Sequence, residues 1–249
     1  MSTFAKRTAL AALFCAAAAL PASAEDDFGI RYGLDAGFRP VKPLTAGLEW
    51  ELLTEDGASA FDRMHFTPYA EWEILPWLET KLAFRWILDR KENEDAWRKD
   101  YWRDAWQLRW DIQPSLELGP VTLSYRLRTT WRESGWMETP TRWNRTHSKI
   151  KGKEPELSEE IALRNALKVV WKSPFWKLRP YLLTELFAVW DDDDVDDSPR
   201  LAKWRNSVGV KRKWLKRFAT TLSFTWDRER EDGINSNDLY LTISQSARF

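Results

Sequence analysis

Charged side chains recur at every second position over long stretches of this 249-residue chain, and the positions between them are mostly apolar or aromatic. If the apolar row faces lipid, the charged row points into an enclosed interior, where carboxylate and guanidinium groups select solutes by charge. The resulting pore-interior candidates are Arg31, Asp35, Glu49, Glu51, Glu71, Glu73, Arg85, Arg109, Arg126, Arg128, Glu185 and Arg205. The same row also contains Lys81, Arg103, Asp111, Arg164, Lys168 and Asp227.

The charged row has a second, structural interpretation. Its two signs are mixed, and no ring of a single sign stands out. A barrel of about ten strands leaves limited room inside, so opposite charges would pair there and fill the interior together with bound water. A selective pore and a sealed, non-catalytic barrel therefore both remain open.

Nucleophilic catalysis would need a serine, a histidine base and an orienting Asn or Asp. Of the two histidines, His65 falls in the charged row and His147 in the stretch RTHSKIKGK. No motif surrounds His65, so we expect it to be hydrogen-bonded or ring-stacked in the interior and assign no catalytic residue. A barrel-embedded lipid hydrolase or acyltransferase remains an alternative function.

Two hydrophilic stretches carry concentrated charge. WDDDDVDDSPR holds six carboxylates within seven residues, but it lacks the glycine and distal glutamate of an EF-hand, so a solvated loop is expected and no metal site is assigned. The basic stretch RTHSKIKGK suits contact with lipopolysaccharide phosphates or simple solvation. Cys15 is the only cysteine and lies in the leader described below, so we expect neither disulfides nor thiol chemistry, and no cofactor.

The alternation defines eleven candidate strands, most of them about 9 to 12 residues long, the length that a tilted strand needs to cross a hydrocarbon layer. They are Phe28 to Arg39, Leu44 to Leu52, Met64 to Ile74, Leu78 to Leu88, Trp102 to Ile112, Val121 to Trp131, Ile161 to Trp171, Leu178 to Trp190, Leu201 to Arg212, Arg217 to Asp227 and the C-terminal strand. Short connections alternate with longer hydrophilic ones, which include TEDGASAFDR, DRKENEDAWRKD and REREDGINSN. This alternation is typical of transmembrane barrels.

The fold class is predicted as all-β, a transmembrane antiparallel β-barrel of about 10–12 strands that occupies residues 25–249 as one domain. No later apolar run approaches 18 residues, which argues against helical spans, and a sheet in lipid must close to pair its backbone. Bacterial single-chain barrels have even strand numbers, so we expect 10 or 12 strands. An eleventh strand would force a parallel closing pair, unless another strand lies within Arg132 to Glu160.

The first residues have the build of a secretory signal peptide. A basic start, an apolar run from Ala9 to Leu20 and the box PASA predict cleavage after Ala24. Without the two basic residues of this leader, 36 basic residues oppose 38 acidic ones, so no bulk charge points to nucleic acid. Many of the 17 tryptophans, such as Trp86 and Trp131, lie near predicted strand ends, where indoles suit lipid headgroups. We therefore predict the bacterial outer membrane, with its lipid and lipopolysaccharide as partners.

The chain ends in a strand with an aromatic last residue. Leu239, Leu241 and Ile243 form its apolar register, which runs on to Phe249. As the closing strand, this register would face lipid. Phe249 resembles the terminal aromatic residue by which outer-membrane barrels are recognised for assembly, so we predict an assembly signal and the barrel-assembly machinery as a partner.

Two later stretches carry a family resemblance. LRPYLLTELF includes Arg179, Pro180, Tyr181, Glu185 and Phe187, and KWRNSVGVKRKW includes Arg205, Asn206, Gly209 and Val210. From about Leu44 onward the chain resembles the bacterial family called domain of unknown function 2490. The resemblance implies an outer-membrane-type barrel and transfers no catalytic residues.

The leading hypothesis is an outer-membrane barrel that serves as a small channel or as a non-catalytic structural barrel. The lipid hydrolase or acyltransferase is the first alternative. A secreted soluble β-sandwich that binds a ligand is the second, which the strand length and the tryptophan content disfavour.

Overall fold

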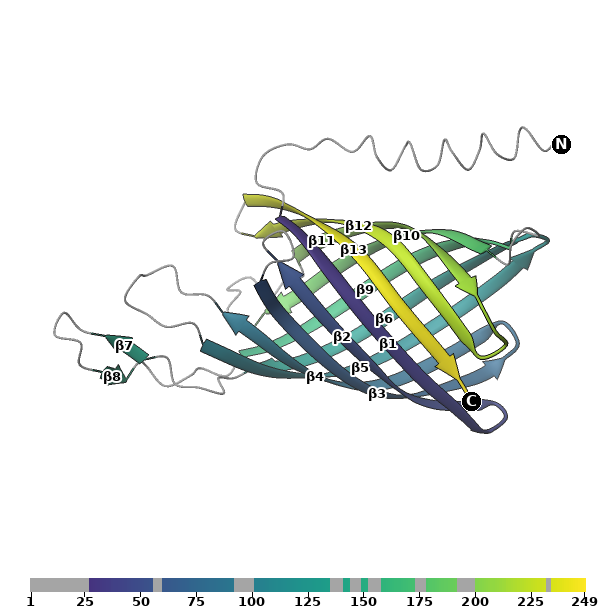
Figure 1. The fold of residues 1–249 in the computed structure, drawn as a ribbon, viewed down its shortest axis with the longest axis horizontal. Helices are drawn as coiled ribbons and strands as arrows, with labels where there is room; N and C mark the ends of the chain where they lie inside the picture. The colour runs from purple at the N-terminus through teal and green to yellow at the C-terminus, as the bar shows by residue number, and fades with distance from the viewer. Residues whose placement is uncertain are drawn as a thin grey trace.

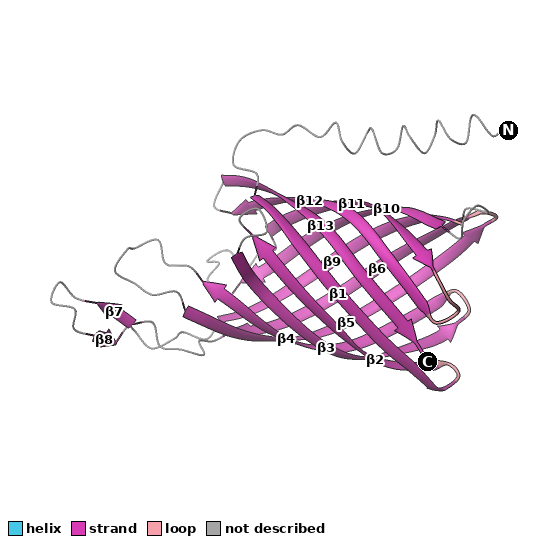
Figure 2. Ribbon diagram, in the orientation of Figure 1, coloured by secondary structure: helices cyan, strands magenta, loops and turns pink. Residues whose placement is uncertain are grey.

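The computed structural model describes residues 27–55, 60–91, 101–134, 141–143, 149–151, 158–172, 178–191, 200–231 and 234–249. Strands and short turns make up these ranges (Figure 2). Among these residues, no helix is long and apolar enough to cross a membrane. The predicted leader with Cys15, His147, and most of the acidic and basic stretches lie outside the described residues.

Eleven strands form a closed barrel (Figure 1), which confirms the predicted fold class. They are β1 (Asp27–Val41), β2 (Leu44–Glu55), β3 (Ala60–Leu75), β4 (Leu78–Lys91), β5 (Tyr101–Leu118), β6 (Val121–Ser134), β9 (Ser158–Trp171), β10 (Leu178–Asp191), β11 (Arg200–Lys213), β12 (Phe218–Glu231) and β13 (Ile234–Arg248). The short strands β7 (Thr141–Trp143) and β8 (Lys149–Lys151) pair only with each other. A closed barrel also excludes the two-sheet sandwich.

The expectation of an even strand number is wrong. The barrel closes through a parallel pair, β1 with β13, which runs from Asp27 opposite Asp238 to Gly37 opposite Arg248. The other barrel pairs are antiparallel, and neither β7 nor β8 joins the barrel. A parallel ladder pairs backbone groups as an antiparallel one does, so an odd number of strands closes without leaving an open edge.

Short turns gather at one end of the barrel, together with the C-terminus (Figure 1). Residues 42–43, 76–77, 119–120 and 214–217 form four of them, and Gly119 has a φ of 59°, which glycine adopts without strain. This is the turn end, and the opposite end is the loop end. Two connections predicted to be long are short at the loop end, because β2 continues to Glu55 and β12 to Glu231. There the hydrogen-bonded pairing of the strands extends beyond the residues that alternate between apolar and polar.

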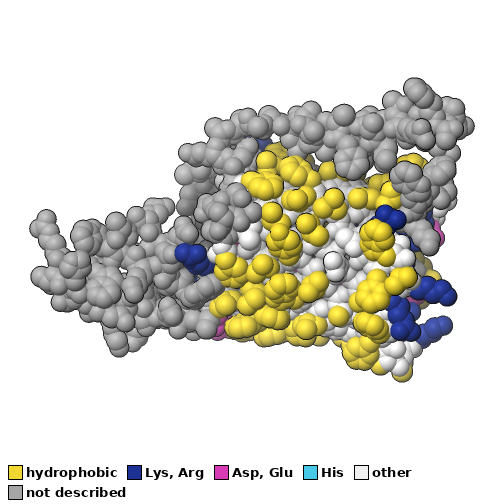
Figure 3. Space-filling view, in the orientation of Figure 1, with side chains coloured by type: hydrophobic (Ala, Val, Ile, Leu, Met, Phe, Trp, Pro, Cys, Tyr) yellow, Lys and Arg dark blue, Asp and Glu magenta, His cyan; other side chains and the backbone are white. Residues whose placement is uncertain are grey.

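Apolar side chains cover the outside of the barrel (Figure 3). In β6, Tyr125 and Trp131 are exposed, whereas Arg128 and Thr130 are buried, as the alternation predicts. Basic side chains appear at the turn end in the same view, where Arg212, Lys213 and the turn residues that follow them are exposed. The outer wall is therefore apolar, and the interior (the lumen) receives the polar row.

Three outward tryptophans donate their indole N–H to threonines of the same wall. Trp110 Nε1 donates to Thr80 Oγ1 at 2.9 Å, and Trp204 Nε1 donates to Thr184 Oγ1 at 3.0 Å. Trp214 pairs in the same way with Thr220 near the turn end. These bonds give the indole N–H groups a hydrogen-bond partner within the outer wall itself.

The β1–β13 seam carries its own side-chain contacts. Arg248 makes a two-pronged ion pair with Asp35 at 2.7 and 2.6 Å, and the Tyr69 hydroxyl donates to the same carboxylate at 2.8 Å. A Cβ at Gly47 would lie 2.4 Å from the Tyr69 hydroxyl, so glycine makes room for this side chain. A polar cluster on the lumen side thus joins β1, β3 and β13.

The last residue continues the seam. The Phe249 amide donates to the Gly37 carbonyl at 2.8 Å, and its own carbonyl accepts from the Arg39 amide at 3.1 Å. The Phe249 ring meets Phe218 edge to face, with centroids 6.2 Å apart. Its ring stays largely exposed on the outer wall.

Candidate functional site

The lumen contains a cavity of about 670 Å³. Residues of ten strands line it, from Glu79 and Gln113 near the turn end to Arg132 and Glu160 near the loop end. Twelve lysines or arginines line the cavity, against seven aspartates or glutamates. The cavity is therefore polar, extended along the barrel and lined by more basic than acidic side chains.

Ten of the twelve pore-interior candidates line this cavity. Glu185 does not, because it is almost fully buried beneath the arginines that bind it. Glu73 lies at the turn end, beside a separate hollow of about 320 Å³ that Arg39 and Lys42 also line. Alternation thus placed most candidates together, and it could not rank them by depth.

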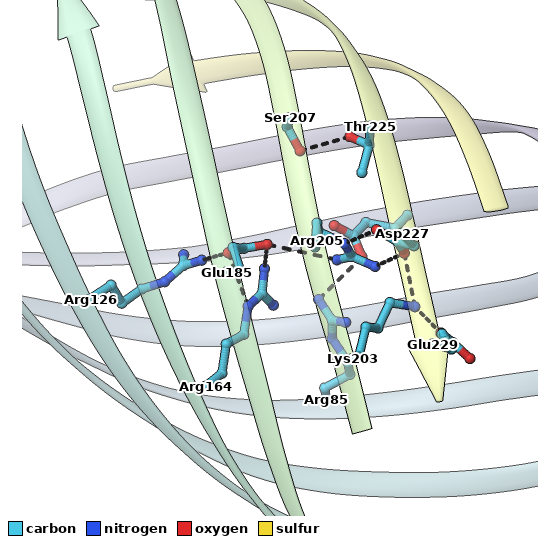
Figure 4. Close-up of polar contacts among 11 residues, drawn as sticks. Arg85, Arg126, Arg164, Glu185, Lys203, Arg205, Ser207, Thr225, Asp227 and Glu229 are labelled. Carbon is cyan, nitrogen blue, oxygen red and sulfur yellow. Dashed lines mark hydrogen bonds and ion pairs between the residues drawn. The ribbon is translucent and has the colours of Figure 1, made fainter. Parts of the chain in front are cut away.

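Glu185 is the centre of the first arginine cluster, where strands β6, β9, β10 and β11 meet (Figure 4). Arg126 Nη2 donates to Glu185 Oε1 at 2.8 Å, and Arg164 Nε donates to the same oxygen at 3.0 Å. Arg164 Nη2 also binds Oε2, and Arg205 Nη1 lies 3.9 Å from that oxygen. With 1% of Glu185 exposed, one carboxylate is enclosed by three guanidinium groups.

Asp227 on β12 is the second buried carboxylate. Arg205 grips both of its oxygens, at 2.6 and 2.5 Å, and Lys203 approaches one of them at 2.8 Å. Lys203 also pairs with Glu229, as Figure 4 shows. Since Arg205 also lies near Glu185, the two carboxylate sites form one continuous network.

Two further lumen carboxylates are also bound by arginines. Asp111 is held by Arg128 through two bonds of 2.6 Å. Asp89, with no exposed surface, is bound by Arg63, by Arg103 at 3.0 Å and by Arg132 at 3.6 Å. Asp89 was missed by sequence reasoning, because it follows the apolar part of its strand, although it continues the period of two from Arg85.

His65 shares one carboxylate with an arginine. Its Nδ1 lies 3.0 Å from Glu51 Oε2, and Arg85 Nη2 donates to the same oxygen at 3.2 Å. Its Nε2 has no hydrogen-bond partner, and no serine is hydrogen-bonded to it within the described chain. His65 is thus a hydrogen-bonded interior residue, as predicted, and its described contacts do not join it to a serine.

Arg109 is the exception among the buried arginines. It lines the cavity with only 4% of its surface exposed, and its Nε and Nη1 atoms have no hydrogen-bond partner. None of the ion pairs found among the described residues includes it. Most of the other lumen arginines hold a carboxylate, whereas Arg109 has no carboxylate partner among the described residues.

No triad of His, Cys, Asp or Glu side chains in the described ranges is arranged to hold a metal ion. No family model matches the sequence, and the search of curated proteins found no match either. The resemblance to domain of unknown function 2490 therefore stays a prediction.

Proposed function

We propose that this protein is a bacterial outer-membrane barrel whose lumen is a narrow channel that favours small anions. The observation that carries the proposal is the polar cavity, which has lining residues from near both ends of the barrel. A cavity with this extent offers a water-filled route along the barrel axis, and its charges face that route.

The outer surface supports the membrane location. Apolar and aromatic side chains are exposed around the barrel, including Leu34, Leu82 and Leu186. Such a surface would be unusual in water, where large exposed apolar areas favour association, and it suits lipid. The tryptophan–threonine bonds also suit hydrocarbon, because each gives an indole N–H a partner there.

The charge balance supports the preference for anions. Of the carboxylates described above, Glu185, Asp89 and Asp227 are buried and bound by basic side chains, and none of them lines the cavity. The remaining lining has more cations than carboxylates. A solute in this route would therefore meet a net positive wall, which attracts anions and repels cations.

Reversal potentials in planar bilayers test the proposal. With purified protein and a KCl gradient, we expect discrete conductance steps. We also expect the reversal potential to shift from zero toward the equilibrium potential of chloride. Arg228→Gln is the matched control, because Arg228 is exposed on β12 in the outward register, so its loss should leave the selectivity unchanged. Cation preference would contradict the proposal.

A sealed structural barrel is the second candidate, and the ion-pair network favours it. Glu185 alone joins β10 to arginines of β6, β9 and β11, so the network links four neighbouring strands of the wall. Side chains held in such a network narrow the lumen and resist movement. A flat current trace from correctly assembled protein would select this candidate over the channel.

Membrane fractionation tests the location that both candidates share. We expect the protein in the outer-membrane fraction, with a gel mobility that changes on boiling, because closed barrels resist detergent until heated. Recovery from the soluble periplasmic fraction, with no heat-dependent shift, would overturn both.

A further inference from the structure

We infer that Arg109 forms the core of a binding site for a small oxyanion within the lumen. The inference rests on the proposed function in one respect: a solute must be able to reach the lumen from an end of the barrel. It adds a named residue and a ligand class to the general preference for anions.

The surroundings of Arg109 leave space for a ligand. In the strand register, Ala83 of β4 and Thr130 of β6 lie opposite Arg109 on its two sides. Both are small, so neither neighbouring strand places a long side chain directly opposite Arg109 in the register. Arg109 lines the cavity, so a solute in the lumen has access to this position.

Two carboxylates that line the cavity with Arg109 are already bound by other basic side chains. Asp111 has both oxygens on Arg128, at 2.6 Å each, and Glu49 is bound by Lys81. No carboxylate among the described residues forms an ion pair with Arg109, so its positive charge has no direct partner among them.

The donors at Arg109 indicate the ligand class. A buried guanidinium nitrogen without a partner is unfavourable, so an acceptor that reaches Nε or Nη1 from the cavity would satisfy a donor that the described residues leave unpaired. Each of these nitrogens shares an edge of the guanidinium group with Nη2, and such an edge matches the paired oxygens of a carboxylate or a phosphate better than a single spherical ion such as chloride. Inorganic phosphate and small carboxylic acids share this chemistry.

Calorimetric titration of the full-length mature protein in detergent micelles tests the site. Inorganic phosphate is the probe, and acetate in a parallel titration distinguishes a phosphate ligand from a carboxylate ligand. Ionic strength is held constant with chloride. We expect saturable binding of one oxyanion per chain, which Arg109→Gln weakens by about tenfold or more, as loss of a hydrogen bond to a charged group does.

Two further variants complete the design. Arg109→Lys keeps the charge without the fork and should bind with intermediate affinity. Arg228→Gln makes the same chemical change on the outer wall and should bind like the wild type. If Arg109→Gln fails to assemble, as judged by the heat-dependent gel shift, Arg109→Lys carries the test, and wild-type affinity in that variant would overturn the site.

The outcomes separate this site from the channel. No saturable binding of phosphate or acetate to the wild type, or equal binding to Arg109→Gln, overturns the site even if the protein conducts. Binding that depends on Arg109 in a protein that gives a flat current trace supports the site and contradicts the channel.

Discussion

Glu185 and Arg109 are buried to nearly the same extent, but their surroundings are opposite. Glu185 accepts hydrogen bonds from two arginines, and a third lies within 3.9 Å. Arg109 lies at the cavity wall with two guanidinium nitrogens unpartnered. A buried charge is retained either because a partner stabilises it or because something other than stability requires it. The first explanation suits Glu185, and the second suits Arg109.

The largest effect on stability is expected at Glu185, the residue whose charge is paired. Glu185→Gln leaves three part-buried guanidinium groups without their common, fully buried carboxylate, which should lower the free energy of unfolding by about 3–5 kcal/mol. Urea unfolding in lipid vesicles, followed by tryptophan fluorescence, measures it. The control is Glu117→Gln, which removes an exposed carboxylate bound by Lys172 and should change stability little. Equal effects of the two variants would mean that the Glu185 cluster is not what stabilises the wall.

The Asp111–Arg128 pair tests whether pairing, rather than charge itself, sets the size of the effect. Asp111→Leu alone leaves Arg128 without its carboxylate and should lower the free energy of unfolding by about 3–5 kcal/mol. The double variant with Arg128→Met should recover most of that loss. The same unfolding assay gives all three values. A double variant as unstable as the sum of its parts would show that the pair contributes packing and not charge compensation.

Removal of the unpaired charge should act in the opposite direction. Arg109→Gln should raise the free energy of unfolding by about 1–3 kcal/mol in buffer without oxyanions, because it removes buried donors that lack partners. Added phosphate should stabilise the wild type and not the variant, since a ligand stabilises only the state that binds it. Destabilisation by Arg109→Gln as large as that of Glu185→Gln would erase the distinction between the two residues.

A change outside the lumen gives the smallest expected effect on stability. Phe249→Ala removes an edge-to-face contact with Phe218 and should cost about 0.5–1.5 kcal/mol once the barrel has formed. As an assembly signal, however, the side chain should matter far more for the yield of inserted protein. The heat-dependent gel shift of membrane fractions measures this yield.

Deletion of Phe249 separates the side chain from the backbone. Deletion also removes the two backbone bonds to Gly37 and Arg39, which Phe249→Ala keeps. If only the deletion impairs assembly, the seam hydrogen bonds are responsible, and the signal interpretation fails. Equal impairment by both variants supports a signal in the ring.

Alternation predicted the barrel and the inward row because a period of two follows directly from strand geometry. It assigned Arg109 and Arg128 to the same interior and could not distinguish them, although Arg128 holds Asp111 and Arg109 holds no carboxylate among the described residues. Ion pairing depends on the register between strands, and on contacts across three or more strands, such as that of Arg126 with Glu185. None of these can be read from one strand at a time.

The strand number was predicted wrongly because the usual even number of strands was given more weight than the pattern of this sequence. Eleven alternating segments, and connections that alternate in length, already required the first and last strands to run in the same direction. The usual even number of strands led to the wrong expectation of 10 or 12. The β1–β13 register pairs eleven residues along the seam, and the Asp35–Arg248 pair adds a side-chain link, so the parallel closure is fully formed.

This odd closure places the start of β1 and the end of β13 at opposite ends of the barrel. Asp27 begins β1 at the loop end, and Phe249 follows β13 at the turn end (Figure 1). In a barrel closed by an antiparallel pair, these two positions would lie at the same end. If the barrel lies in the outer membrane as we propose, an epitope inserted just ahead of Asp27 and one joined after Phe249 would be reached by antibody from opposite sides of that membrane. The parallel seam would then make the barrel a vectorial scaffold, with its first and last strands open to different compartments.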